Sequence, residues 1–195
     1  MTSRREFLKA GLVASALPVA ARADFATRRE ASASVPLYKV LYDTRFESSV
    51  AFARRAASRG LAVHAMAGDM TRFWYDDLYH RWRQEPAAIA GLTAEGALFC
   101  LERLAWDQRM RVVYRGRHTA AADGCVAHRF EGPAALLPMA ADATAEGAWP
   151  AALVDVIGAC PRGRVESRLA ESVTRSAAAP SEPLFSWVIG PVSRA

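Results

Sequence analysis

The stretch LYKVLYDTRFESSVAFARRAASRGLAVHAM, residues 37–66, decides the fold of this 195-residue chain. Its first six residues form a compact apolar run rich in β-prone side chains, which predicts a strand. Ser48 or Ser49 can begin a helix with one apolar face, and Gly60 can end it. The run at 61–66 predicts a second short strand. Strand, helix and strand within about 30 residues make a βαβ unit, whose strands are parallel and whose crossover is right-handed.

The rest of the chain adds helices and strands to this unit. The apolar spacing predicts two helices, over residues 69–82 and 93–106, which Pro86 separates. The run at 110–114 predicts a third strand, parallel to the first two because a helical crossover precedes it, and the run at 184–189 predicts a closing strand. The fold class is therefore α/β: a mixed sheet with three parallel strands, helices on both faces, and antiparallel additions near the C-terminus.

The chain begins with the features of an export signal. A charged start precedes a short apolar stretch and a small-residue site at 21–23, so we expect cleavage before Asp24. The run SRREFLK at 3–9 resembles the twin-arginine (Tat) signal point for point, with Arg4 and Arg5 as the arginine pair. That resemblance implies export of a folded protein by the twin-arginine translocation machinery into the periplasm. The apolar stretch has about 12 residues and a bilayer needs about 20, so we expect no membrane anchor after cleavage.

Composition and patterning predict a simple organisation. We expect the signal peptide at 1–23, a polar, flexible arm at 24–35, and a single α/β domain at 36–195. The leader holds four basic residues and one acidic residue, so the formal net charge of +5 falls to about +2 after its removal. No basic run is interleaved with aromatic residues, so nucleic acid is not an expected partner.

Cysteines and motifs limit the chemistry that the chain can perform. Cys100 lies in an apolar helical pattern and is expected to be packed. Cys125 and Cys160 lie in loop-like settings, where a disulfide bridge between them is one alternative in an oxidising compartment. The sequence has no dense Cys/His spacing, phosphate loop, dinucleotide loop or nucleophile elbow, so it predicts no metal site and no cofactor.

Aromatic residues on the outer sides of the two predicted helices form a candidate partner surface. Phe99 and Trp106 lie opposite the core face of the 93–106 helix, and Phe73 falls on the polar face of the preceding one. A helix that is apolar on two sides is either covered by the chain's own loops or offered to a partner. Both alternatives stay open, and the second predicts a larger periplasmic protein as the partner.

Polar residues follow each of the three predicted parallel strands, and open α/β sheets bind ligands beyond the carboxyl ends of such strands. These residues are Asp43 and Arg45, Gly68 and Asp69, and Arg117 and His118. Together they predict a site for an anionic or hydroxylated small molecule, or a pair for acid–base work. Arg45 beside two carboxylates would keep both ionised, which leaves His118 as the group that titrates near neutral pH.

These observations lead to two functional hypotheses. The first is a periplasmic α/β accessory or ligand-binding protein, for example a small subunit that is co-exported with a redox enzyme or assists it, without catalysis of its own. The second is a small periplasmic enzyme that uses Asp43, Asp69 and His118 for acid–base chemistry on a polar small molecule.

Overall fold

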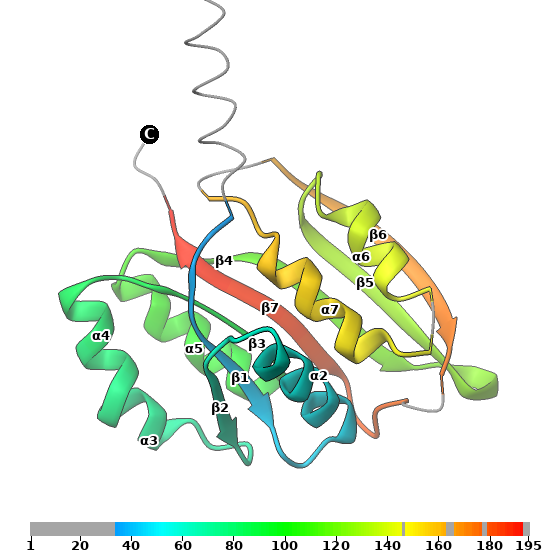
Figure 1. Cartoon of the computed structure of the whole chain (residues 1–195), viewed down its shortest axis with the longest axis horizontal. Helices are drawn as coiled ribbons and strands as arrows, with labels where there is room; N and C mark the ends of the chain where they lie inside the picture. Colours follow the sequence, from blue (N-terminus) through cyan, green and yellow to red (C-terminus); the bar gives the residue numbers. More distant parts are fainter. Residues whose placement is uncertain (1–33, 146, 163–165, 177–178, 193–195) are drawn as a thin grey trace, which may run out of the picture. The chain divides into compact units, whose positions relative to one another are not determined.

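The computed structural model describes residues 34–145, 147–162, 166–176 and 179–192, so the predicted signal peptide and residues 24–33 of the arm lie outside the described residues. The described residues form a seven-stranded mixed sheet with the strand order β2-β1-β3-β7-β4-β5-β6 (Figure 1). The strands are β1 (Leu37–Asp43), β2 (Val63–Met66), β3 (Ala88–Ala94), β4 (Met110–Ala120), β5 (Cys125–Pro133), β6 (Ser167–Arg175) and β7 (Leu184–Pro191).

The predicted βαβ unit is present. β1 pairs in parallel with β2, and helix α2 (Glu47–Ser58) connects them. Gly60, with a φ of +77°, follows the end of α2, in the left-handed conformation that glycine adopts without a steric penalty. β1 also pairs in parallel with β3, whereas β7, β4, β5 and β6 continue the sheet through antiparallel pairs. The predicted fold class, a mixed α/β sheet with three parallel strands, is confirmed.

The third parallel strand is β3, and not the predicted strand at 110–114. β3 has the sequence AIAGLTA, and six of its seven residues are buried. A strand buried on both faces lacks the alternation of apolar and polar residues that marks a half-exposed strand. The small residues of β3 also have low β-propensity, so the sequence pattern does not predict this strand. The predicted strand belongs to β4, which runs in the same direction as β1 but is separated from β3 by the antiparallel β7.

Helices cover both faces of the sheet. On one face lie α2, α6 (Leu137–Ala143) and α7 (Trp149–Gly158), and on the other lie α5 (Glu95–Asp107) and a helical segment made of α3 (Thr71–Phe73), a π-turn (Trp74–Leu78) and α4 (Tyr79–Gln84). α5 begins two residues after the predicted start of its helix, because β3 extends to Ala94.

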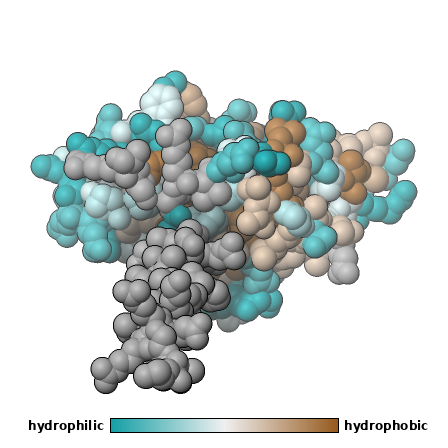
Figure 2. All heavy atoms as spheres, turned by 90° about the horizontal axis from the view of Figure 1, so that it is seen from above, coloured by the Kyte–Doolittle hydropathy of each residue, from teal (hydrophilic) through white to brown (hydrophobic). Residues whose placement is uncertain are grey.

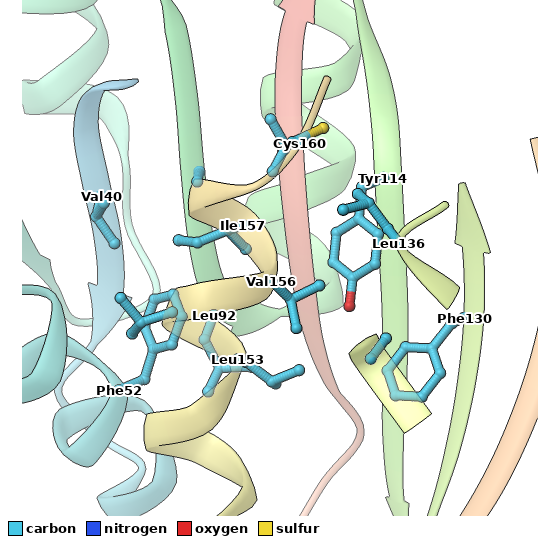
Figure 3. Packing of buried hydrophobic residues seen from close by; sticks show 14 of the residues in the cluster. Val40, Phe52, Leu92, Tyr114, Phe130, Leu136, Leu153, Val156, Ile157 and Cys160 are labelled. Atoms are coloured by element: carbon cyan, nitrogen blue, oxygen red, sulfur yellow. The ribbon is translucent and has the colours of Figure 1, made fainter. Parts of the chain in front are cut away.

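The larger core layer lies between α7 and the sheet. Leu153, Val156 and Ile157 of α7 pack between Phe52 of α2 and Phe130 of β5 (Figure 3). All five side chains are fully buried, and burial of one such side chain stabilises the fold by about 1.5–3 kcal/mol. α5 and the α3–α4 segment form the second layer against the opposite face of the sheet.

The π-turn changes which side of the α3–α4 segment is buried. Phe73, predicted on the polar face, is buried, and its ring lies 4.5 Å from that of His64 between centroids. Tyr75, two residues further along, is exposed. A π-turn holds more residues than an α-helical turn, so the residues before and after it no longer follow a 100° spacing. The assignment of Phe73 to a partner surface is therefore wrong.

Phe99 and Trp106 lie on the outer face of α5. Phe99 is 55% exposed and Trp106 is 45% exposed, so neither ring is covered by a loop among the described residues. The guanidinium carbon of Arg103 lies over both rings, 5.3 Å from the centroid of Phe99 and 4.5 Å from that of Trp106. Their role as a partner surface stays a prediction.

The cysteines differ from the sequence-based expectation. All three are free, and Cys100 is exposed on α5 rather than packed. Cys125 begins β5 and lies at one end of the strands. Cys160 follows α7 and lies at the other end, where its carbonyl oxygen accepts a hydrogen bond from the Val35 N–H at 2.8 Å. A bridge between Cys125 and Cys160 is therefore wrong on geometric grounds. Burial raises the pKa of the Cys160 thiol to about 12.

The folded domain begins slightly earlier than predicted. Ser34 forms a β-bridge with Pro161, and Val35 is buried, so the last two residues of the predicted arm belong to the domain. Among the described residues, no helix combines the length and the apolar character that crossing a membrane requires.

Candidate functional site

Asp43 and Arg45 form an ion pair at the carboxyl end of β1. The Arg45 Nε donates to Asp43 Oδ1 at 2.9 Å, and its Nη2 donates to Oδ2 at 2.6 Å. Asp43 is fully buried, and its backbone N–H donates to the Ser49 hydroxyl at 2.8 Å. The Arg45 guanidinium lies against Gly68, where an added Cβ would stand 3.0 Å from the guanidinium carbon. The structure therefore brings Asp43, Arg45 and Gly68 together, as predicted.

The other predicted site residues lie elsewhere. Asp69 is exposed and accepts a hydrogen bond from the Thr71 N–H at 2.8 Å. Hydrogen bonding to the side chain and to the backbone N–H of Thr71 holds the Asp69 pKa below its usual value. Arg117 is exposed, whereas its neighbour His118 is fully buried beneath α7. The predicted convergence of Asp43, Arg45, Asp69 and His118 is therefore wrong. β7 separates β4 from β3, and β4 extends to Ala120, which leaves His118 inside a strand.

A cleft of about 550 Å³ opens beside Arg45, between the N-termini of α2 and α7. We name it the α2/α7 cleft. It is lined by Thr44, Arg45, Glu47, Ser48, Val50, Ala51 and Arg54 on one side, and by Gly147, Ala148, Pro150 and Ala151 on the other. β2 and β3 lie on opposite sides of β1, so the cleft is at a topological switch point, the place where open α/β sheets bind ligands.

The two helices that form the cleft run side by side in the same direction. Asp155 of α7 forms ion pairs with Arg55 of α2 at 3.6 Å and with Arg59, the C-cap residue of α2, at 2.6 Å. Such exposed pairs contribute about 0–1 kcal/mol each, so they fix the alignment more than the stability. The apolar residues beneath α2 and α7 belong to one buried cluster, which holds the N-termini of both helices near the carboxyl end of β1.

The electrostatics of the α2/α7 cleft favour a negatively charged group. The N-cap residues of both helices, Phe46 and Ala148, make no side-chain cap hydrogen bond, and the helix dipole gives each N-terminus partial positive charge. Arg54 makes no ion pair with any described residue. Among the described residues, the acidic groups nearby include Glu47, in the first turn of α2, and Glu182, 3.9 Å from Arg45.

A buried polar cluster lies beneath the first residue of α7. The Nδ1 atoms of His118 and His128 are 2.7 Å apart, and His118 Nε2 is 2.9 Å from the Ser186 hydroxyl. The Trp149 ring covers His118, with centroids 4.6 Å apart. Since a single proton fits between the two facing nitrogens, one ring donates and the other accepts, so at least the accepting ring is neutral.

The protonation state of this pair corrects a second expectation. Burial and the neighbouring His128 lower the pKa of His118 well below its usual value, and burial lowers the pKa of His128 to about 4. His118 is therefore not a group that titrates near neutral pH. The expectation was wrong because it placed His118 at an open strand end, whereas the ring is enclosed by Trp149, His128 and Phe130.

The sequence analysis missed Arg54, His128 and Ser186. His128 alternates with Val126 and Phe130 along β5, and that period-two pattern was the signal that it faces the core. Nothing in the sequence indicated that Arg54 faces the start of α7, because the two segments are far apart in the chain.

A second hollow of about 560 Å³ lies at the other end of the strands from the α2/α7 cleft. Its lining includes Pro36, Pro86, Pro161 and Pro191. Its charged residues include Arg81 and Glu85, which pair with each other at 3.1 Å. It is at the amino ends of β1 and β3, where open α/β sheets do not usually bind ligands. The α2/α7 cleft is therefore the stronger candidate.

Among the residues that the structure describes, no group of three or more histidine, cysteine, aspartate or glutamate side chains is placed to hold a metal ion. No protein-family model, curated protein or solved structure matches the chain.

Proposed function

We propose that this chain is an exported accessory or ligand-binding protein whose α2/α7 cleft holds a small anionic molecule, with a carboxylate or phosphate group. The observation that carries the proposal is the positive end of the α2 dipole beside Arg45 and Arg54 at the topological switch point. Backbone N–H groups at a helix N-terminus and a guanidinium group both donate hydrogen bonds to such anions.

Arg45 has a fixed position in this proposal. Asp43 holds its Nε and Nη2, and the missing side chain of Gly68 makes room for the guanidinium plane. Nη1 lies outside the ion pair with Asp43 and can donate to a ligand. Arg54 supplies the second cation, on the exposed side of α2. The two guanidinium groups together offer several N–H donors to a small anion.

The separation of the other candidate residues supports binding over catalysis. Asp43 is buried in its ion pair, Asp69 begins the α3–α4 segment, and His118 lies beneath α7. The acid–base alternative therefore has no shared site for these three residues, and we do not propose it further.

Calorimetric titration of the full chain with inorganic phosphate and with malonate tests the anion site. We expect saturable binding of at least one probe, and at least about a tenfold loss of affinity in Arg54→Glu. Arg59→Ala is the matched control, since Arg59 is at the C-terminal end of α2 and pairs with Asp155 away from the cleft, and this variant should bind like the wild type. Equal affinity in Arg54→Glu and the wild type, or no binding at millimolar probe, would reject the proposal.

The proposed export is tested separately. Arg4→Lys together with Arg5→Lys should leave the protein in the cytoplasm with its leader attached, because the arginine pair is what the twin-arginine resemblance implies is recognised. Cell fractionation with intact-mass analysis measures both outcomes. A mutant that still accumulates in the periplasm as a product beginning at Asp24 would contradict this route.

A further inference from the structure

The two edges of the sheet differ in length. β2 forms one edge with four residues, and β6 forms the other with nine. Among the described strands, β6 pairs with β5 alone, so its outer side has no strand partner. A long edge strand with free backbone groups pairs readily with another strand, and proteins usually protect such edges.

The outer part of β6 also exposes apolar side chains. Val173 is 67% exposed and Leu169 is 51% exposed. Both lie on the sheet face that α5 covers elsewhere, but no side chain of β5 or β6 belongs to the core layer under α5. Figure 2 shows much of the apolar surface in that view at the end of the molecule where Figure 1 places α6 and β6.

The backbone of β6 shows which groups point outward. The Ser176 N–H donates to the Gly124 carbonyl oxygen at 3.1 Å, and the register continues as Cys125 opposite Arg175. Backbone groups in an antiparallel pair alternate between the partner and the opposite side. The even-numbered residues of β6 therefore bond to β5, and the N–H and C=O groups of Glu171, Val173 and Arg175 point away from the sheet.

We propose that β6 is a self-association edge, where a second copy of this chain adds its own β6 in antiparallel orientation to form a continuous sheet across a two-fold axis. The two-fold axis lies next to Val173, so Val173 of one copy pairs directly with Val173 of the second copy. Glu171 then lies opposite Arg175 of the second copy, and Arg175 lies opposite its Glu171. Outward backbone groups of these three positions supply about six hydrogen bonds between the copies.

Charge complementarity selects this register. Glu171 already pairs with Arg129 of β5 at 3.4 Å, so in the dimer each Glu171 lies between two arginines. The register that would pair Leu169 with Val173 places Glu171 directly opposite Glu171 of the second copy, and like charges in that position are destabilising. The interface uses no residue of the α2/α7 cleft, so this proposal does not depend on the proposed function.

The proposal is tested by measuring the molar mass of the full chain at roughly 5–500 µM. The method is light scattering after size-exclusion chromatography. The wild type should shift from monomer towards dimer as concentration rises. Glu171→Arg and Arg175→Glu each place like charges across the axis and should weaken the dimer at least about tenfold, whereas the double variant Glu171→Arg/Arg175→Glu should restore it.

Val173→Lys should also give a monomer, because it puts two positive charges together on the axis. Val63→Lys on the opposite edge strand β2 is the matched control and should leave the mass unchanged. Melting temperatures of all variants check that they fold. A wild type that stays monomeric over the whole range, or a dimer that persists in both single charge variants, would overturn the proposal.

Discussion

The parallel part of the sheet, β2-β1-β3, and the antiparallel part, β4-β5-β6, bury their residues differently. Parallel strands need long crossovers, and here these are helices that cover both faces, whereas β4 and β5 are joined by a short connection that covers neither. Ile89 of β3 and Leu169 of β6 lie on the same face of the sheet, yet Ile89 is fully buried and Leu169 is half exposed. The placement of the helical connections therefore decides how much of each face is covered.

The largest expected effect compares these two residues directly. Ile89→Ala removes a side chain enclosed by α5 and should cost about 2–5 kcal/mol of unfolding free energy. Leu169→Ala, on the same sheet face, should cost less than about 0.5 kcal/mol, because the site faces solvent. Urea unfolding curves at a protein concentration where the chain is monomeric measure both changes. Equal costs would show that the open face of the antiparallel part is covered in solution.

Acid should destabilise the antiparallel part first. His118 and His128 have folded-state pKa values below their usual value. Below about pH 6.5, these histidines therefore bind protons in the unfolded chain but stay neutral in the folded chain. Stability is thus complete above that pH and falls as the pH drops towards 4, by on the order of 2–3 kcal/mol for His128. Unfolding curves between pH 7 and pH 4 measure this loss.

Two variants test whether the loss of stability in acid comes from the buried pair of His118 and His128. Replacing both histidines, as His118→Leu/His128→Leu, should flatten the dependence of stability on pH over this range, whatever the absolute stability of the variant. His80→Gln removes an exposed histidine and should keep the acid loss unchanged. A wild type with the same stability at pH 7 and at pH 4.5 would contradict a neutral, buried histidine pair.

The smallest expected effect concerns the outer face of α5. Phe99→Ser with Trp106→Ser should lower stability by no more than about 1 kcal/mol, since both rings are half exposed and lose mainly their contacts with Arg103. Thermal unfolding of the isolated protein measures it. A loss of several kcal/mol would mean that the rings are buried, and the face could then no longer be considered a partner surface.

Local patterns in the sequence determined the βαβ unit, α5 and the strand at 184–189. Each of these depends on neighbouring residues: an apolar run bounded by turn residues, a helical spacing, or a glycine at a helix end such as Gly60. The end of β1 was predictable for the same reason, and with it the grouping of Asp43 and Arg45, which are two residues apart.

Only the tertiary structure decided the rest, because it depends on which distant segments meet. β7 comes last in the chain but inserts between β3 and β4, and this insertion separates His118 from the end of β1. The π-turn moves Phe73 into the core through packing that no spacing rule contains. The α2/α7 cleft likewise exists only once α7 docks beside α2, since contacts across long sequence separations leave no periodic signal in either segment. The facing pair of His118 and His128 comes from the register of β4 against β5.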